Sequence, residues 1–579
     1  MPKKFFITTA IDYTNSPPHV GHAYEKVLAD VIARYHRLNG EKVFFLTGVD
    51  QHGQKVQQSA KKAGIAPAEF VKGITQEFVD LWKKLDVKYD AWAATTDPLH
   101  KNCVREILQR LFDQGQIYKD KQSGYYSVRQ EQFLTDKERG TDGEFGPEWG
   151  EIEFREEENY YFKLGQHKEW LLRYIDNRKD AVIPDFRQTE LRNAVERISG
   201  DLCISRPKSR LDWGIELPFD KDFVTYVWFD ALTNYITFAG YEPDDDFIKE
   251  ASFETKTNFK TYHPKLEGSS PNFRDLWPAL HVIGKDILVP AHGIYWLCIL
   301  HALGFGDVEM PTLLVHGWWN FSGTKMSKSI GNIVDPQSSR RQLKPRLRQG
   351  LDRFNIEQVK KNEPPLSRNK ITSIVERCGS EALRNYLMRD ISTGQDADFS
   401  ELRLIERYNS DLANNIGNLL SRTLSMAQQY REGRLLANFD DVAFEEHRFR
   451  LTRQIAEQGY PFAMGQFNVD SALGLISMAG QSCNALIDDH APWKLAKDPM
   501  RANHLDSVLY HLAESLRIIA ILISPVLPGA AHRISDQLNW RVSFKGKEKR
   551  FRLEDTKWGG LPDGHVVGKP VPLFPRIDA

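Results

Sequence analysis

Two imidazoles and a glycine lie at the start of a helix near the amino end of the chain. The segment His19-Val20-Gly21-His22 follows Pro17-Pro18, and apolar residues then recur at helical spacing until Gly40. The first turn of a helix exposes backbone amides at the positive end of the helix dipole, and it therefore binds phosphate. His19 and His22 add hydrogen-bond donors, while Gly21 allows a flat ring to approach the backbone. This segment predicts a nucleotide site that has neither a G-x-G-x-x-G fingerprint nor a P-loop lysine.

A second cationic motif, Lys325-Met326-Ser327-Lys328-Ser329, lies between two glycines much further along the chain. We call it the lysine loop. Taken alone it fits an ordinary solvated loop, and only together with the histidine motif does it become informative. A third group, Asp50, follows a predicted strand. Its carboxylate could cap a loop or bind an ammonium group, and the local sequence leaves both readings open.

The elements that position these residues belong to a nucleotide-binding α/β fold. Residues 5–10 and 43–46 read as buried strands on either side of the first helix, a β-α-β opening. His19 and Asp50 each follow one of these strands, at the edge where open parallel sheets bind ligands. A long stripe of leucines and isoleucines between 505 and 523 predicts an α-helical bundle in the last third of the chain.

The composition narrows the classes of protein to which the chain could belong. The chain has 579 residues, 41% hydrophobic and 27% charged, which is typical of a globular protein of several domains. The net charge of -1 requires any nucleic-acid contact to use local basic patches. Five scattered cysteines without a C-x-x-C pair fit a reducing cytoplasm, and we expect no membrane span. We also expect no cleaved presequence and no appended basic module at the carboxyl end.

The predicted fold class is α/β: a Rossmann-like parallel-sheet catalytic domain with an inserted connective domain, followed by an all-α helical-bundle domain. The predicted boundaries are 1–117 for the first half of the catalytic domain, 118–225 for the connective insertion, 226–336 for the second half with the lysine loop, 337–396 for a junction containing a basic stretch at 337–373, and 397–579 for the helical bundle and tail.

The histidine motif and the lysine loop together resemble the two signatures of class I aminoacyl-tRNA synthetases. Four further segments, 10–13, 226–231, 284–287 and 394–399, narrow the resemblance to methionyl-tRNA synthetases, and Ala491-Pro492-Trp493 is similar to the same family. The resemblance covers nearly the whole chain apart from 337–373. It implies that the chain joins L-methionine to the 3′ adenosine of tRNA(Met), the initiator included, through a methionyl-adenylate made from ATP with Mg²⁺.

The resemblance also implies roles for individual residues. The catalytic residues would be His19, His22, Lys325 and Lys328, and the ATP site would add Gly21, Gly284, Asp286 and Ser327. The methionine site would comprise Ile11, Tyr13, Asp50, Trp228, Ala231, Leu232, Tyr235, His292 and Trp296, with Asp50 on the substrate ammonium. A thioether suits a soft aromatic box with weak hydrogen-bond donors. The anticodon-reading residues would be Asn418, Arg422, Asn484, Asp488 and Trp493.

Three departures from the family pattern have consequences. Asp12 takes the place of the usual proline, and His292 lies one residue further from Asp286 than the family spacing implies. Where the family often has zinc cysteines, this chain has Ser127, Gln130, Gly146 and Trp149. These side chains offer no thiolate or imidazole, so we expect no structural zinc. We also expect no metal-ligating residues elsewhere in the chain.

Two other functions remain open at this point. A class I synthetase for cysteine would need zinc thiolates, and those for leucine, isoleucine or valine would need a larger editing insertion than 118–225. A non-catalytic tRNA-binding protein is the alternative from a different class, although the complete histidine and lysine sets argue against it. We expect no DNA or membrane partner and a monomer. The basic stretch 337–373, with ten basic and three acidic residues, fits either a tolerated surface insertion or a phosphate-binding patch.

Overall fold

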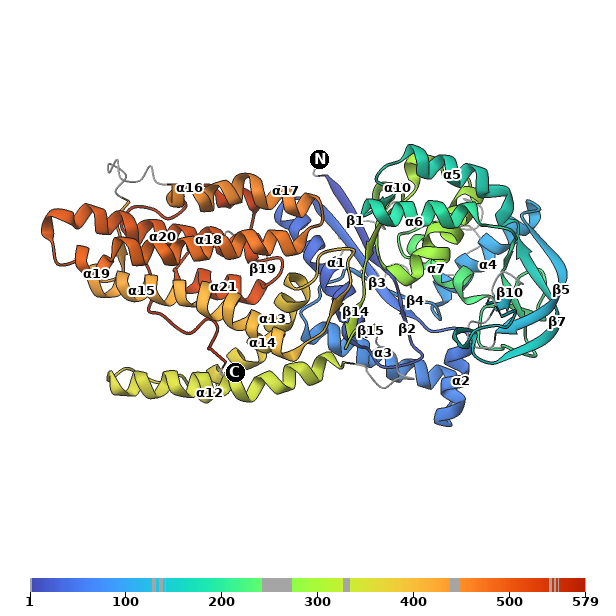
Figure 1. Ribbon diagram of the computed structural model, residues 1–579, viewed down its shortest axis with the longest axis horizontal. Coiled ribbons are helices and arrows are strands. Elements are labelled where there is room, and N and C mark those ends of the chain that lie inside the picture. Colours follow the sequence, from blue (N-terminus) through green and yellow to red (C-terminus); the bar gives the residue numbers. More distant parts are fainter. Residues whose placement is uncertain are drawn as a thin grey trace.

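The computed structural model describes residues 3–127, 132–134, 139–140, 142–241, 273–325, 334–437, 447–540, 544–545, 548–549 and 551–577. The molecule is elongated, and a half that contains the main sheet adjoins a helical half along the long axis (Figure 1). The predicted α/β fold class with a following helical bundle is confirmed.

The first half is built on a seven-stranded parallel sheet. Its strand order is β2-β3-β1-β12-β13-β8, and β4 also pairs with β3. The strands are β1 (Lys4–Thr9), β2 (Asp12–Tyr13), β3 (Lys42–Asp50), β4 (Ala91–Ala94), β8 (Val182–Ile183), β12 (Leu280–Gly284) and β13 (Thr312–His316). These strands are rich in β-branched and aromatic residues, as expected for strands that are buried on both sides.

Both faces of this sheet are covered, because neighbouring residues of one strand enter different cores. Phe6 and Phe44 belong to one buried cluster, while Ile7 and Phe45 belong to the other. Helices α1 and α3 line the second cluster, and α4 and α7 line the first. The helices of this half are α1 (Val20–Leu38), α2 (Gln54–Ala63), α3 (Pro67–Lys84), α4 (Pro98–Asp113), α7 (Val227–Thr237), α10 (Phe273–Leu276) and α11 (Leu297–Ala302), with a π-helical segment at Leu288–Trp296.

The connective region contains a separate antiparallel sheet of order β6-β5-β7-β9. Its strands are β5 (Ile117–Ser127), β6 (Gln132–Leu134), β7 (Ile152–Phe162) and β9 (Leu202–Cys203), and β10 (Ser205–Pro207) pairs with β11 (Phe223–Thr225) nearby. Helices α5 (Lys168–Asn177) and α6 (Asp185–Glu196) flank strand β8, which returns to the edge of the main sheet beside β13. The segment 118–225 is therefore not wholly outside the catalytic sheet.

The basic stretch forms two antiparallel helices, α12 (Pro336–Lys360) and α13 (Arg368–Arg389). Helix α12 runs through Pro345, while Pro364-Pro365 lie in the turn between the two helices. Pro345 is exposed, so water can satisfy the carbonyl that its missing N–H leaves unbonded. A stripe of leucines, Leu343, Leu347 and Leu351, lies at helical spacing and is buried in the same core as the apolar face of α13.

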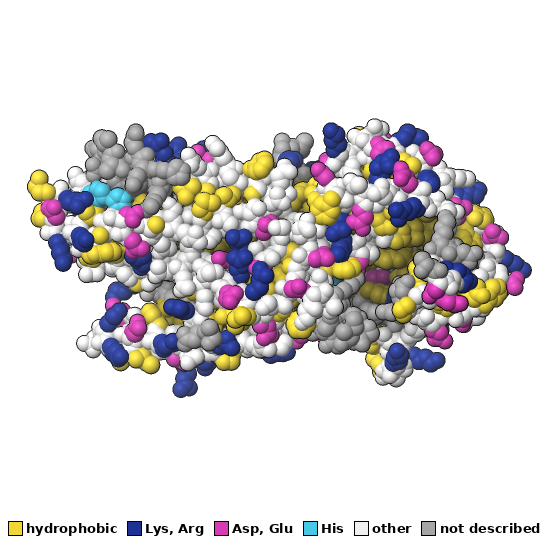
Figure 2. Space-filling model, in the orientation of Figure 1, with side chains coloured by type: hydrophobic (Ala, Val, Ile, Leu, Met, Phe, Trp, Pro, Cys, Tyr) yellow, Lys and Arg dark blue, Asp and Glu magenta, His cyan; other side chains and the backbone are white. Residues whose placement is uncertain are grey.

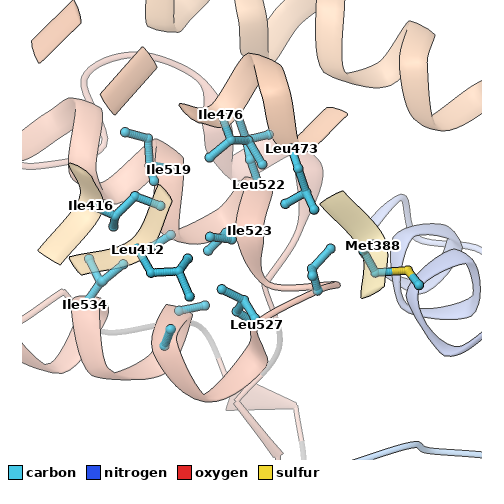
Figure 3. Close-up of a cluster of buried hydrophobic side chains, with 14 of the residues drawn as sticks. Met388, Leu412, Ile416, Leu473, Ile476, Ile519, Leu522, Ile523, Leu527 and Ile534 are labelled. Carbon is cyan, nitrogen blue, oxygen red and sulfur yellow. The ribbon is translucent and has the colours of Figure 1, made fainter. Parts of the chain in front are cut away.

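The second half is a helical bundle around α20 (Ala502–Ile523), which is buried on all sides rather than along one stripe. The surrounding helices are α14 (Glu401–Arg407), α15 (Asn418–Arg431), α16 (His447–Gln454), α17 (Tyr460–Gly465), α18 (Val469–His490), α19 (Pro492–Leu495) and α21 (Pro528–Gln537), with π-helical segments at Tyr408–Gly417 and Ile455–Gly459. Figure 3 shows Ile519, Leu522 and Ile523 of α20 packed among Leu412, Ile416 and Leu473.

The chain's last described segment, 551–577, returns across the bundle toward α13. Phe574 is buried there, and the Tyr408 hydroxyl donates to the Pro575 carbonyl at 2.9 Å. Short ladders join β14 (Trp319–Phe321), β15 (Thr324–Lys325) and β16 (Ala397–Asp398), and also β17 (Arg434–Leu435) with β20 (His565–Val566) and β18 (Phe544–Lys545) with β19 (Glu548–Lys549). Among the described helices, none is both long and apolar enough to cross a membrane.

Candidate active site

The two histidines close the first turn of α1 as a reciprocal cap. His19 Nδ1 accepts from the Gly21 amide at 3.1 Å, and His22 Nδ1 accepts from the His19 amide at 3.1 Å. Their ring centroids are 3.8 Å apart. Since Nδ1 is the acceptor in both rings, the hydrogen of each neutral ring lies on Nε2. The helix start thus holds two imidazoles as Nε2 donors beside its own positive dipole end.

Gly21 makes room for the ring of His19, a residue of its own turn. A Cβ at this position would lie 2.9 Å from His19 Cε1 and 3.1 Å from Nδ1. The flat ring that approaches the Gly21 backbone in this structure is therefore the imidazole of His19. A side chain at position 21 would therefore require the His19 ring to shift from its position at the helix start.

Residues on either side of the lysine loop are described. The Val20 amide donates to the Val334 carbonyl at 3.1 Å, so Val334, just before α12, contacts the first turn of α1. Before the loop, the Gly323 amide donates to Asp398 at 2.9 Å and β14 pairs with β15 and β16. Only the backbone of Lys325 is described, and Ser327 and Lys328 lie outside the described residues.

One face of α7 carries four of the residues assigned to the methionine site. Trp228, Ala231, Leu232 and Tyr235 follow helical spacing, and all except the half-buried Trp228 are buried. Ile11 and Trp228 pack against the same core that contains Trp296. The structure therefore brings the predicted aromatic set together.

His292 joins this set through a π-helical turn at Leu288–Trp296. The wider turn accommodates the extra residue between Asp286 and His292, because a π-turn holds one more residue than an α-turn. The Tyr235 hydroxyl donates to His292 Nε2 at 2.7 Å, and His292 Nδ1 donates to the Ile287 carbonyl at 3.0 Å. Burial lowers the pKa of His292 to about 4, so the ring is a neutral acceptor.

His281 is a member of this core that the sequence did not identify. Its ring stacks on Tyr235, with centroids 4.2 Å apart, and accepts from Trp296 Nε1 at 3.1 Å. Its other nitrogen lies 2.6 Å from the Thr8 hydroxyl. Burial lowers the pKa of His281 well below its usual range. The signal in the sequence was a histidine inside an otherwise apolar strand.

Asp50 lies at the carboxyl end of β3, paired in the ladder with Tyr13. Its Oδ1 accepts from the His52 amide and the Thr95 hydroxyl, both at 3.3 Å. Burial and the nearby charge of Asp230 raise the pKa of Asp50 well above its usual range. These contacts are long and neutral, so the site favours a cation beside this carboxylate.

Tyr13 reaches the turn that follows Asp50. Its hydroxyl lies where a Cβ on Gly53 would be, at 2.6 Å, and Gly53 has a φ of +105°. Only glycine adopts this conformation and admits the phenol at the same time. Strand β2, through Tyr13, is therefore in direct contact with the turn that follows Asp50.

A buried histidine–aspartate–histidine group supports this turn, and sequence reasoning missed it. Asp230 accepts from His52 Nδ1 and from His100 Nε2, each at 2.7 Å. Burial opposes ionisation, but the two imidazoles outweigh it and lower the pKa of Asp230 to about 2. Asp230 lies on α7 directly before Ala231, so it ties this part of α7 to the Asp50 turn.

Lys26 occupies a second buried ionic group that the sequence did not reveal. Its ammonium donates to Asp12 at 2.7 Å, to Glu25 at 2.8 Å and to the Ala10 carbonyl at 2.7 Å. Glu25 also pairs with His316 at 3.1 Å, at the end of β13. The departure at Asp12 thus supplies a partner for a lysine inside α1 and ties the helix to the β1–β2 turn.

Gly284 is the last residue of β12, which pairs with β1, and Asp286 follows just beyond the strand. A Cβ on Gly284 would lie 2.7 Å from Asp286 Oδ1, which accepts from Trp318 Nε1 at 3.1 Å. Lys285 pairs with Asp396 at 2.6 Å, so two separate family segments meet here.

The connective region holds the four positions at which zinc cysteines were missing, and three of them are described. Ser127 is buried and donates to the Trp149 carbonyl at 2.5 Å. A hydroxyl bonded to a carbonyl and an indole do not form a zinc ligand set. Gln130 lies outside the described residues, and Gly146 precedes the short 3₁₀ turn at Pro147–Trp149.

In the bundle, α15 and α18 bring the predicted anticodon residues together in pairs. Asn418 donates to Asn484 at 3.1 Å, and Arg422 donates to Asp488 at 2.6 Å. Trp493 follows on α19 with 41% of its surface exposed. These residues form a polar patch with one exposed indole, which suits stacking and edge contacts with unpaired bases.

Comparisons with known proteins agree with this arrangement. The family model for tRNA synthetases class I (M) matches residues 5–144, 149–357 and 367–424. It includes most of the stretch 337–373, which we expected to lie outside the resemblance.

Named relatives share the whole length of the chain. The methionine–tRNA ligase of Lactococcus lactis is 35% identical over 100% of this chain and 78% of its own length. That of Caldanaerobacter subterraneus is 37% identical over 100% of this chain and 80% of its own length.

A solved structure of Mycobacterium tuberculosis methionyl-tRNA synthetase in complex with methionyl-adenylate superposes with a TM-score of 0.80, at 32% identity, over 99% of this chain and 100% of the other. The chain belongs to the class I aminoacyl-tRNA synthetases, in the family of methionine–tRNA ligases.

Proposed function

We propose that this chain activates L-methionine with ATP, taken as its magnesium complex, and transfers the methionyl group to the 3′ adenosine of tRNA(Met), the initiator included. One observation carries the proposal. The segment after β1 bears Ile11 and Tyr13 and then leads into the α1 cap, and Val334, which follows the lysine loop in the chain, accepts a hydrogen bond from Val20 of that cap. This arrangement supports binding of both substrates at one edge of the sheet.

In the first step the methionine carboxylate attacks the α-phosphorus of ATP, and pyrophosphate leaves. The protein supplies positioning and charge stabilisation rather than a covalent nucleophile. His19 and His22 would donate from Nε2 to the phosphates, and Lys325 and Lys328 would neutralise the departing pyrophosphate. Loss of one such donor typically costs about 3 kcal/mol of transition-state stabilisation. Gly284 and Asp286 would bind the ribose.

The amino acid would lie between the α7 face and the Asp50 turn. The thioether contacts Trp228, Tyr235 and Trp296, soft aromatic surfaces that suit a polarizable sulfur. Neutral His292 presents no charge to repel it, and the ammonium pairs with Asp50. Anticodon reading would use the patch of Asn418, Arg422, Asn484, Asp488 and Trp493.

Two further proposals accompany this function. The five unpaired cysteines, all within the described residues, support a cytoplasmic location. The Ser127–Trp149 contact supports a connective region without zinc. Elemental analysis of the untagged protein should find well under one zinc per chain, and a stoichiometric value would contradict the second proposal.

ATP–pyrophosphate exchange with each amino acid in turn tests the function. Methionine, and no other standard amino acid at comparable efficiency, should support exchange of labelled pyrophosphate into ATP without tRNA. Preference for leucine, valine or cysteine would overturn the proposed substrate. Absence of exchange with every amino acid, despite tRNA binding, would favour the non-catalytic alternative.

A further inference from the structure

The buried group of His52, Asp230 and His100 joins the two walls between which methionine would lie. Asp230 belongs to the first turn of α7, the helix whose face carries residues assigned to the thioether. His52 belongs to the turn that follows Asp50, the residue assigned to the ammonium. The two walls come from segments 178 residues apart in the chain, so their separation in the folded protein depends on contacts such as this one.

Asp50 is connected to Asp230 by a second route as well. The Thr95 hydroxyl, which donates to Asp50 at 3.3 Å, lies just beyond β4. Two residues later, the Asp97 side chain caps the start of α4, and His100 follows in the first turn of that helix. His100 Nε2 then donates to Asp230 at 2.7 Å. The Asp50 carboxylate is thus linked to α7 both through the turn after β3 and through the start of α4.

His100 is suited to hold Asp230 and nothing else. Its side chain is 0% exposed, and its Nδ1 has no hydrogen-bond partner among the described residues. A neutral ring leaves only a lone pair at this atom, whereas an imidazolium would bury an unpaired N–H there. The ring is therefore a single neutral donor, and it lies parallel to the ring of Phe238 with centroids 6.0 Å apart.

Asp230 is an anion at the centre of these contacts. Burial opposes its ionisation, but the imidazoles outweigh burial and lower the pKa of Asp230 to about 2. Its place in the first turn of α7 adds the positive end of the helix dipole. Hydrogen bonds to a buried anion are shorter and more directional than apolar contacts. The two bonds of 2.7 Å therefore fix α7 against the Asp50 turn in one position.

We propose that His100 is a positioning residue for the choice of amino acid: through Asp230, it sets the distance between the Asp50 turn and the α7 face. This inference rests on the proposed function, in which the ammonium and the thioether occupy those two walls. Hydrophobic side chains line a hollow in this half of the molecule (Figure 2). An apolar surface distinguishes amino acids by fit, so its distance from the ammonium site decides which length of side chain is accepted.

The test begins with His100→Leu, which removes the donor to Asp230 and keeps an apolar side chain beside Phe238. In methionine-dependent pyrophosphate exchange, the KM for methionine should rise at least about fivefold, because the two walls are no longer held at one distance. The KM for ATP should stay within about twofold. His100→Gln can place an amide donor near the position of Nε2, and it should restore the KM for methionine to within about twofold.

A second measurement compares methionine with ethionine, whose alkyl group on sulfur is longer by one methylene. One methylene in an apolar pocket typically changes kcat/KM by roughly 10–200-fold. His100→Leu should lower the preference for methionine over ethionine at least about threefold, and His100→Gln should keep it. His511→Leu is the matched control, since it removes another buried imidazole, from α20 in the helical half, and should change neither the KM for methionine nor this preference.

A merely structural imidazole gives a different result. His100→Leu would then lower the yield of active protein but leave the KM for methionine and the preference over ethionine unchanged, and this outcome would overturn the proposal. Equal changes in His100→Leu and His100→Gln would overturn it too, because only the glutamine keeps a donor. If His100→Leu does not fold, His100→Asn, which is polar but too short to reach Asp230, takes its place in the same measurements. Lack of methionine-dependent exchange in the unchanged protein would instead refute the proposed function.

Discussion

At the scale of single residues, the buried carboxylate of Asp50 offers a binding site for a positive charge. Among the described residues, the Asp50 carboxylate accepts two long hydrogen bonds, and its neighbour Asp230 is kept ionised by two histidines. A carboxyl group held this way gains much from an incoming ammonium, since the cation offsets the burial and the Asp230 charge that raise the pKa of Asp50. Substrate binding and protonation of Asp50 are therefore linked.

This linkage predicts that methionine binding releases a proton. Because burial and Asp230 raise the pKa of Asp50 in the free protein, and a bound ammonium lowers it, affinity should increase as pH rises toward and through that pKa. Calorimetry in buffers of different ionisation enthalpy measures the released proton directly. Asp50→Asn should bind weakly and show no such release. Proton uptake on binding, or a pH-independent affinity, would contradict the assigned contact.

Lys26 gives a second prediction at this scale, concerning stability. Lys26→Met leaves Asp12 and Glu25 buried without their shared cation, which should cost about 3–5 kcal/mol at pH 8. Burial raises the pKa of Asp12 from 3.8 to about 7, so the folded state holds this proton more tightly than the unfolded state. That contribution is full below about pH 4 and is lost as pH rises through 7.

The penalty of Lys26→Met should accordingly shrink between pH 8 and pH 6, where Asp12 takes up a proton. Urea unfolding followed by intrinsic fluorescence at the two pH values measures this difference. Lys62→Met, at an exposed position on α2, is the control and should change stability by less than about 0.5 kcal/mol at either pH. A penalty that is equal at both pH values would show that the carboxylates are not what the lysine stabilises.

At the scale of elements, the hairpin of α12 and α13 extends from the base of the lysine loop alongside the helical half (Figure 1). Some of its cations are tied within the protein, as Lys344 is to Glu376 at 2.5 Å. Others, including Arg346, Lys360 and Lys370, are exposed and have no ion-pair partner among the described residues. The family model does not match 358–366, a segment that includes most of the turn between the two helices.

We expect this hairpin to bind tRNA phosphates without reading sequence. Changing Arg346, Arg348 and Lys360 to glutamine together should weaken tRNA binding and reduce the slope of log affinity against log salt by up to about three. Methionine-dependent pyrophosphate exchange without tRNA should stay normal, since these residues lie outside the site. The measurement is the affinity of each variant for tRNA across a series of salt concentrations.

A matched triple variant, Lys179, Lys221 and Lys569 to glutamine, removes the same charge from exposed positions elsewhere. It should leave most of the salt dependence in place. An unchanged slope in the hairpin variant would identify the stretch as a tolerated surface insertion. Equal effects in both variants would show that net charge alone, rather than this hairpin, attracts the RNA.

At the scale of the whole molecule, Arg384 joins the two halves. It lies on α13, is 1% exposed, and donates to Asp30 of α1 at 2.8 Å and to the Leu85 carbonyl at 3.0 Å. It also donates to the carbonyls of Val526 and Pro525, at 2.7 and 3.1 Å, between α20 and α21. One guanidinium thus satisfies carbonyls and a carboxylate from the catalytic half and from the bundle.

Arg384→Leu should therefore uncouple the halves. Removing one partner from such a buried network typically costs about 3–5 kcal/mol. Calorimetric unfolding should show a lowered or divided transition, and tRNA charging should fall further than pyrophosphate exchange, because only charging needs the bundle held against the active site. A transition like that of the unchanged protein would mean that apolar packing alone holds the halves together.

Much of this molecule could be predicted from short-range sequence patterns. The helix after His19 followed from apolar residues at helical spacing, whereas the α7 residues Trp228, Ala231, Leu232 and Tyr235 were named from the family resemblance. The helical bundle followed from its apolar spacing as well. The extent of burial did not follow from the sequence. The apolar residues of α20 predicted one buried stripe, yet the helix is enclosed on all sides. Its Glu514 and Arg517 form an ion pair inside the core at 2.6 Å.

What only the tertiary structure decided were contacts between residues far apart in the chain. His52 and Asp230 are 178 positions apart, and Gln51 and Trp213, which share a hydrogen bond, are 162 apart. Nothing in the local sequence marks such pairs, because a buried polar residue finds its partner only when the strands and helices that carry the two groups pack together. The sequence by itself determined the elements and the chemical groups at their ends. Packing determined which carboxylates are neutralised and which histidines stay neutral.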